Sequence, residues 1–128
     1  MSSQEGDFQV RLLLFSGKPD PEWYVNGEAS RELRERAHTS IGEIQERRPP
    51  ATSVLGYRGF LVMNIGRISD IPEEFRVYRG VLSQNPGTRA IHWRDMGQVE
   101  QFLLREARER GFGEALEAFG AGTEGEGV

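Results

Sequence analysis

Hydrophobic positions along the first half of the chain alternate as they do in β-strands. Residues 8–15 place apolar side chains on one face (Phe8, Val10, Leu12 and Leu14) and predict a first strand. Residues 54–65 form the longest apolar run and contain two glycines, each of which would cost a helix about 1 kcal/mol, so a second strand is expected there. Because both faces of this second strand are mostly apolar, we expect it to lie between two covering layers.

Two longer segments have the spacing of amphipathic helices. After a short extended piece at residues 23–25, Asn26 is a suitable N-cap for a helix to about residue 47, with an apolar stripe at spacings of four and three (Leu33, Ala37, Ile41 and Ile44). Asp95 is expected to cap a second helix with Gln98 as the reciprocal residue of a capping box, and Gly111 is expected to end it in a left-handed conformation supported by Phe112. A short helical piece at residues 114–119 follows.

The segment between the helices predicts two more strands. Residues 75–83 favour a third strand, and residues 85–88 favour a type II turn into a fourth at 89–93. Asp70 is expected to cap one helical turn at Glu73-Glu74. The order is then β-α-β-β-β-α, an α+β fold with a mainly antiparallel sheet of about four strands and two main helices on one face. The first helix is expected to cross over between parallel strands in the right-handed sense.

Length and composition favour one soluble domain. The 128 residues can bury a hydrophobic core, and we expect a domain at 8–119 between disordered ends at 1–7 and 120–128. The absence of cysteine excludes disulfides and thiolate chemistry. A net charge of −4, with acids and arginines interleaved, argues against a nucleic-acid surface. No apolar run has the length of a membrane span and the N-terminus lacks a signal-peptide pattern, so a cytoplasmic protein is expected.

A short internal repeat places an arginine in two strands. Tyr57-Arg58-Gly59 recurs as Tyr78-Arg79-Gly80. One interpretation is a glycine bulge or a close approach between backbones in both strands. The other sets Arg58 and Arg79 side by side as a pair that binds a carboxylate or a phosphate.

The loop at residues 16–23, Ser-Gly-Lys-Pro-Asp-Pro-Glu-Trp, is a second candidate site. A nucleotide-binding loop is excluded, because the upstream glycine is absent and the prolines prevent the following helix. With Phe15, the stretch resembles a Phe-Ser-Gly-Arg-Pro-Asn-Pro-x-Trp pattern of small bacterial proteins of uncharacterised function, with Lys18 for the arginine and Asp20 for the asparagine. This resemblance covers about nine residues and implies no activity. Either Lys18 and Trp23 contact a ligand, with Asp20 handling protons, or Trp23 pins a purely structural loop.

His92 and Asp95 form the third candidate site, at the joint between a strand and a helix. They could act as an acid–base pair, or Asp95 could serve only as a helix cap. No spacing of His38 or His92 with carboxylates suggests a metal site, and no cofactor motif is present. We therefore expect no metal and no cofactor.

Two functions from different classes follow. Two helices can cover only one face of the sheet, so six apolar residues risk forming an exposed patch (Leu13, Phe15, Phe60, Val62, Tyr78 and Leu82). The leading hypothesis is a non-enzymatic interaction module that forms a homodimer or serves as an accessory subunit. The alternative is a small enzyme or binding protein for an acidic small molecule, which would use Arg58, Arg79 and the 16–23 loop.

Overall fold

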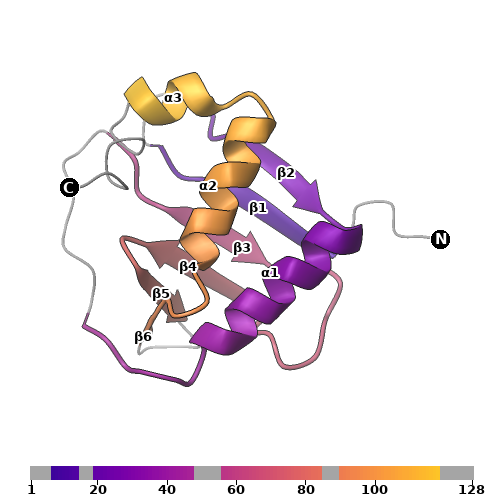
Figure 1. The fold of residues 1–128 in the computed structure, drawn as a ribbon, viewed down its shortest axis with the longest axis vertical. Helices are drawn as coiled ribbons and strands as arrows, with labels where there is room; N and C mark the ends of the chain where they lie inside the picture. The colour runs from indigo at the N-terminus through magenta and orange to yellow at the C-terminus, as the bar shows by residue number, and fades with distance from the viewer. Residues whose placement is uncertain (1–6, 15–18, 48–55, 85–89, 119–128) are drawn as a thin grey trace.

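The computed structural model describes residues 7–14, 19–47, 56–84 and 90–118, which form a sheet with helices on one of its faces (Figure 1). The strands are β1 (Phe8–Leu12), β2 (Glu22–Val25), β3 (Phe60–Met63), β4 (Glu74–Tyr78), β5 (Val81–Gln84) and β6 (Ile91–Arg94). The helices are α1 (Gly27–Ser40), α2 (Val99–Glu109) and α3 (Gly113–Ala118). Lys18, Phe15, the 85–88 turn and, apart from Asp7, the expected disordered ends lie outside the described residues, so the domain boundaries stay predictions.

The predicted α+β fold with an antiparallel sheet is confirmed, but the sheet has six strands in the order β2-β1-β3-β4-β5-β6. The expectation of about four strands was wrong for two reasons. Residues 22–25 pair with β1 as a full strand, and the segment predicted as one strand at 75–83 divides into β4 and β5. The expected parallel crossover was also wrong, because β1 pairs antiparallel with β3.

A tight turn at Arg79-Gly80 divides the predicted third strand. Both residues have positive φ, 51° and 78°, as a two-residue type I′ hairpin requires. Asparagine or aspartate followed by glycine is the usual signature of such a turn, and arginine is not. The sequence therefore did not predict the turn at Arg79-Gly80.

The core lies between the sheet and the helices. In β3, Phe60 and Val62 are fully buried on the helix side, whereas Leu61 and Met63 are half-buried on the opposite side. Helices α1 and α2 both lie on the same face (Figure 1), so neither of them supplies the expected second covering layer. We call the opposite face of the first four strands the open face; by register and alternation it carries Gln9, Arg11, Glu22, Tyr24, Leu61, Met63, Glu74 and Arg76.

The predicted apolar patch is not on the surface. Its five described members are all buried, with exposed fractions of 8% or less (Leu13, Phe60, Val62, Tyr78 and Leu82). The large apolar residues that are exposed in the described chain are other ones. Tyr24 and Ile65 are 43% and 41% exposed, while Ile44 and Met96 are 37% and 47% exposed elsewhere.

Helix α1 is shorter than predicted, and the chain after it pairs with an edge strand of the sheet. It ends at Ser40 instead of near residue 47. The chain then runs beside β6, where the Arg94 amide donates to the Ile44 carbonyl at 2.7 Å and the Glu46 amide donates to the His92 carbonyl at 2.9 Å. This pairing covers backbone groups that an open edge would expose to other chains.

The other predicted helix signals have mixed outcomes. Gly111 has φ 94°, and the Phe112 amide donates to the Ala107 carbonyl at 2.9 Å, so the predicted left-handed C-cap is confirmed. Asn26 occupies the N-cap of α1, although its side chain makes no capping bond. The helical turn expected after Asp70 was wrong, because Glu74 begins β4.

An ionic link joins the two main helices. Glu32 Oε2 on α1 lies 2.8 Å from Arg36 Nη2 and 3.1 Å from Arg105 Nη2 on α2. The hydrogen bond from Arg36, followed by the bond from Arg105 and both positive charges, holds the pKa of Glu32 below its usual value despite some desolvation. A lowered folded-state pKa stabilises the fold above the unfolded pKa, and this stabilisation is lost as pH falls through the folded pKa.

We expect Glu32→Gln to lower the free energy of unfolding at pH 7 by about 0.5 kcal/mol, since the carboxylate is 39% exposed and therefore screened. The difference from the unmodified protein should shrink towards zero as pH falls through and below the acidic range. Urea unfolding at pH 7 and near pH 3 measures it, with Glu35→Gln as the control, since Glu35 is an exposed α1 residue that forms no ion pair with a described side chain. An equal difference at both pH values would contradict the assignment.

Candidate functional site

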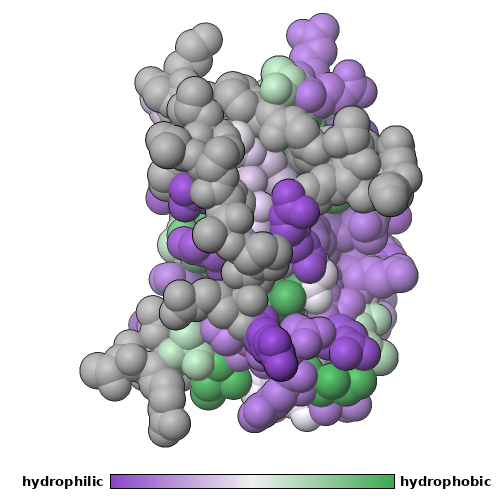
Figure 2. Space-filling view, turned by 90° about the vertical axis from the view of Figure 1, so that its left-hand side faces the viewer, coloured by the Kyte–Doolittle hydropathy of each residue, from purple (hydrophilic) through white to green (hydrophobic). Residues whose placement is uncertain are grey.

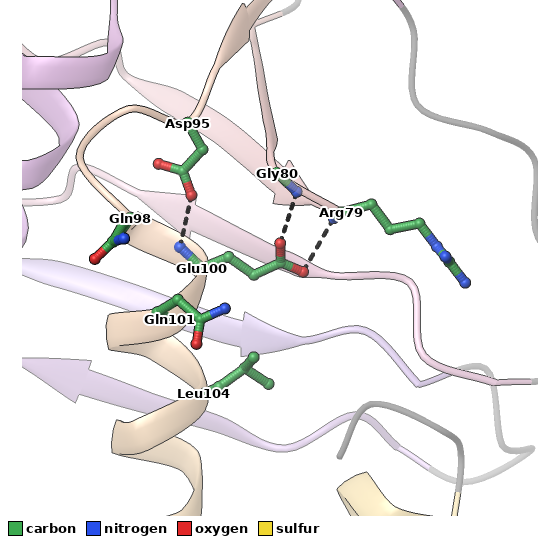
Figure 3. A pocket seen from close by; sticks show the side chains of 7 residues that line it. All are labelled: Arg79, Gly80, Asp95, Gln98, Glu100, Gln101 and Leu104. Atoms are coloured by element: carbon green, nitrogen blue, oxygen red, sulfur yellow. Dashed lines mark hydrogen bonds between the residues drawn. The ribbon is translucent and has the colours of Figure 1, made fainter. Parts of the chain in front are cut away.

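A polar pocket of about 360 Å³ lies where the β4–β5 turn meets the start of α2 (Figure 3). Its lining residues come from the turn, from the loop after β6 and from the first turns of α2 (Arg79, Gly80, Asp95, Gln98, Glu100, Gln101 and Leu104). Two of the candidate residues named from the sequence, Arg79 and Asp95, meet here. The pocket is therefore the place in the described chain where sequence and structure agree best on a site.

Glu100 holds this junction together. Its carboxylate accepts hydrogen bonds from the Arg79 amide at 3.0 Å, from the Gly80 amide at 2.8 Å and from the Tyr57 hydroxyl. In Figure 3 the Glu100 side chain reaches across to the turn, while the Arg79 side chain points away from it. A type I′ turn leaves the amides of its two central residues without a partner inside the hairpin, and Glu100, only 8% exposed, supplies that partner.

Asp95 is a helix cap, as one of the two interpretations held. Its carboxylate accepts from the amides of Val99 at 2.8 Å and Glu100 at 2.9 Å, and from the Ser40 hydroxyl at 3.0 Å. The capping box was wrong, because Gln98 occupies the N-cap with φ 59° and its side chain makes no capping bond. Asp95 thus satisfies the first amides of α2 from three residues before the N-cap and ties that helix to the end of α1.

The two carboxylates of the pocket are already engaged as acceptors for structural groups. A carboxylate that left these amides to move a proton would break the hairpin anchor or the helix cap. Two neutral amides, Gln98 and Gln101, complete the polar lining. The arrangement can hold a small polar molecule by hydrogen bonds, but two carboxylates against one guanidinium disfavour an acidic one.

The other predicted site residues lie elsewhere. His92 Nδ1 is 2.7 Å from Ser83 Oγ across the β5–β6 pair, while the described hydrogen bonds of the Asp95 carboxylate come from Ser40, Val99 and Glu100. Asp20 accepts from the Leu14 amide at 3.1 Å and closes its own loop. Lys18 lies outside the described residues.

Trp23 and Arg58 are also outside this pocket. Trp23 is buried in the core, with its ring centroid 6.3 Å from that of Phe60 and 5.7 Å from that of Phe112, as the structural interpretation of the loop expected. The half-buried Arg58 donates its backbone amide to the Leu13 carbonyl at 2.8 Å. Neither residue joins Arg79 at the pocket lined by the turn, and the paired-arginine site stays a prediction without a described cavity.

The internal repeat brings its tyrosines together. The Tyr57 and Tyr78 ring centroids are 5.6 Å apart. Gly59 fits the structural interpretation of the repeat, because a side chain there would overlap the Val77 carbonyl oxygen, whereas Gly80 has open space and serves the turn. The repeat therefore marks two strands that pack against each other at this point.

The described residues contain no group of three or more histidines and acids placed to hold a metal ion. Nor does any helix in the described ranges have the length and apolar character to cross a membrane. Comparison of the chain with protein-family models, with curated protein sequences and with solved structures found no match.

Proposed function

We propose that this protein is a binding module that works by contact with another protein chain through the open face of its sheet. The observation that carries the proposal is the one-sided covering of the sheet within the described residues: their helices lie on one face, and the other keeps partly exposed apolar residues among charged ones (Figure 1). Antiparallel sheets tolerate water on one face when that face is polar. Here three residues of the face are apolar or aromatic instead (Tyr24, Leu61 and Met63).

Other surfaces of the described chain are less suitable. In the side view of Figure 2, the described residues are mostly hydrophilic, and hydrophobic ones form small separate areas. The groove between α1 and α2, of about 470 Å³, is lined mainly by charged residues, and two of them, Glu32 and Arg105, pair with each other. Charged groups are depleted at the centres of protein interfaces, so the open face is the better candidate.

The alternative, an enzyme or binding protein for an acidic small molecule, is the weaker proposal. It needs cationic side chains to converge on one cavity. The pocket at the β4–β5 turn contains Arg79 but also the carboxylates of Asp95 and Glu100. An acidic ligand would meet repulsion from both.

Photocrosslinking in the host cells tests the proposal without assuming which partner binds. A photoreactive amino acid in place of Leu61 on the open face should give a covalent adduct with a protein chain. The same amino acid in place of Met96, which is 47% exposed and lies away from this face, is the matched control and should give none. Absence of an adduct at Leu61, or equal adducts at both positions, would contradict the proposal.

A further inference from the structure

We infer that the partner of the open face is a second copy of this chain, bound face to face about a two-fold axis. This inference rests on the function proposed above and names the partner. It is carried by the register of the sheet, which aligns the residues of the open face into two rows that complement each other. A two-fold interface requires such self-complementarity, because each residue pair occurs twice in reciprocal form.

The two rows cross the first four strands side by side. Register pairs place Glu22, Arg11, Leu61 and Arg76 in one row, and Tyr24, Gln9, Met63 and Glu74 in the other. Each strand thus contributes one residue to each row, two positions apart and on the same face. The two-fold axis would lie between the two sheets and run parallel to the rows, midway between them. It would place the first row of one copy over the second row of the other.

This axis matches apolar residues with apolar ones at the centre of the face. Leu61 of one copy lies opposite Met63 of the second copy, and the reverse contact is its symmetry mate. Both residues are half-buried in the single chain, so a partner sheet would complete their burial. Packed sheets lie about 10 Å apart, a distance that side chains of this size fill.

The same axis matches charge with opposite charge. Glu74 and Arg76 are exposed neighbours on β4, and no described side chain forms an ion pair with either of them. In the two-fold arrangement, Glu74 of each copy lies opposite Arg76 of the other. The remaining charges of the face already pair within the chain, since Arg11 Nη2 lies 3.0 Å from Glu22 Oε2. The face therefore carries equal numbers of acidic and basic groups and does not repel its own copy.

The contact area is small, so we expect a weak dimer. Four strands spaced by about 4.8 Å and about four residues long cover an area of roughly 15 Å by 15 Å. A standard interface buries about 800 Å² on each partner, so this dimer should be weaker than one of standard size. We expect a dissociation constant in the range of roughly 10–100 µM.

Sedimentation equilibrium from about 5 µM to about 500 µM, with a charge-reversal series, tests the inference. The average mass of the unmodified chain should rise from 14.5 kDa towards twice that value. Glu74→Arg or Arg76→Glu alone places like charges opposite each other and should weaken association roughly ten-fold. The double reversal restores reciprocal pairs and should return the affinity to within about three-fold of the unmodified chain. Both positions are exposed, so circular dichroism should show that every variant folds.

The outcomes distinguish a failure of the dimer inference from a failure of the proposed function. A mass of one chain at the highest concentration overturns the inference, and so does a double reversal that binds as weakly as the single changes. The proposed function would survive either result if the Leu61 photoadduct contained a different protein. If the Leu61 position gave no adduct at all, the proposed function itself would fail.

Discussion

Replacing Gly59 with alanine should remove a large part of the stability of the fold. Gly59 has φ 92°, a conformation that costs an alanine about 1–2 kcal/mol. A Cβ atom at this position would also overlap the Val77 carbonyl oxygen and lie 2.8 Å from Tyr78 Cβ, and neither group is the end of a flexible side chain. Strand β3 would have to move away from β4, so we expect a loss of about 4 kcal/mol or more, against a total of about 5–15 kcal/mol for a typical domain.

Urea unfolding followed by circular dichroism measures this loss. The internal repeat provides the control, because Gly80 occupies the same place in the second copy of the motif and also has positive φ, yet open space surrounds it. Gly80→Ala should therefore cost only the backbone strain, about 1–2 kcal/mol. Equal losses for the two variants would show that the close approach at Gly59 does not constrain the sheet.

Glu100→Ala should have the second largest effect. The change removes one acceptor from the Tyr57 hydroxyl and from the turn amides of Arg79 and Gly80. Tyr57 is 5% exposed, so water cannot readily replace the bond to its hydroxyl, whereas the two turn residues are exposed. Bonds to a charged acceptor contribute about 1.5–3 kcal/mol each at most, and partial replacement by water leaves an expected loss of about 2–4 kcal/mol.

Two further variants separate the hydrogen bonds of Glu100 from the place it occupies. Glu100→Gln keeps the shape but sets an amide N–H₂ group against donors, and we expect a loss of about 1–2 kcal/mol. Gln101→Ala changes the exposed neighbour on α2 and should alter the free energy of unfolding by less than about 0.5 kcal/mol. If Glu100→Ala were no more costly than Gln101→Ala in chemical unfolding, the junction would not anchor the hairpin.

Strong local patterns made several elements of the fold predictable. The alternation at residues 8–15 identified β1, and Gly111 with Phe112 identified the end of α2. Failures occurred where a contact distant in sequence decided the structure. Arg79 adopts a left-handed turn conformation, and its amide is bound by Glu100, 21 residues later. The strand order also depended on pairings between distant segments, which periodicity does not encode.

The candidate site was predictable only in part. Arg79 and Asp95 were named from the sequence, but as members of separate sites, and Asp20 and Trp23 serve their own loop and the core. Glu100 was missed because it reads as an ordinary helix-surface acid. One signal pointed to it: the residue lies directly after Val99 in the first turn of an amphipathic helix, next to the buried stripe.

The surface available for association differed from the predicted one for a related reason. The five described residues of the expected patch face the core or are covered by the chain itself. Glycines at positions 56 and 59 interrupt the alternation before β3, so side-chain faces could not be assigned from the sequence. The register of the folded sheet made the assignment and placed Leu61 and Met63 together with Tyr24 on the open face.

The most direct test of self-association through the open face uses the methionines of the unmodified chain. The sequence contains three, of which Met63 lies on the open face and Met96 lies away from it. With ¹³C-labelled methionine methyl groups, NMR spectra across a dilution from about 1 mM to about 10 µM report both positions in one sample. We expect the Met63 signal to shift with concentration while the Met96 signal stays fixed. A fixed Met63 signal, or a shift at Met96 alone, would contradict self-association through the open face.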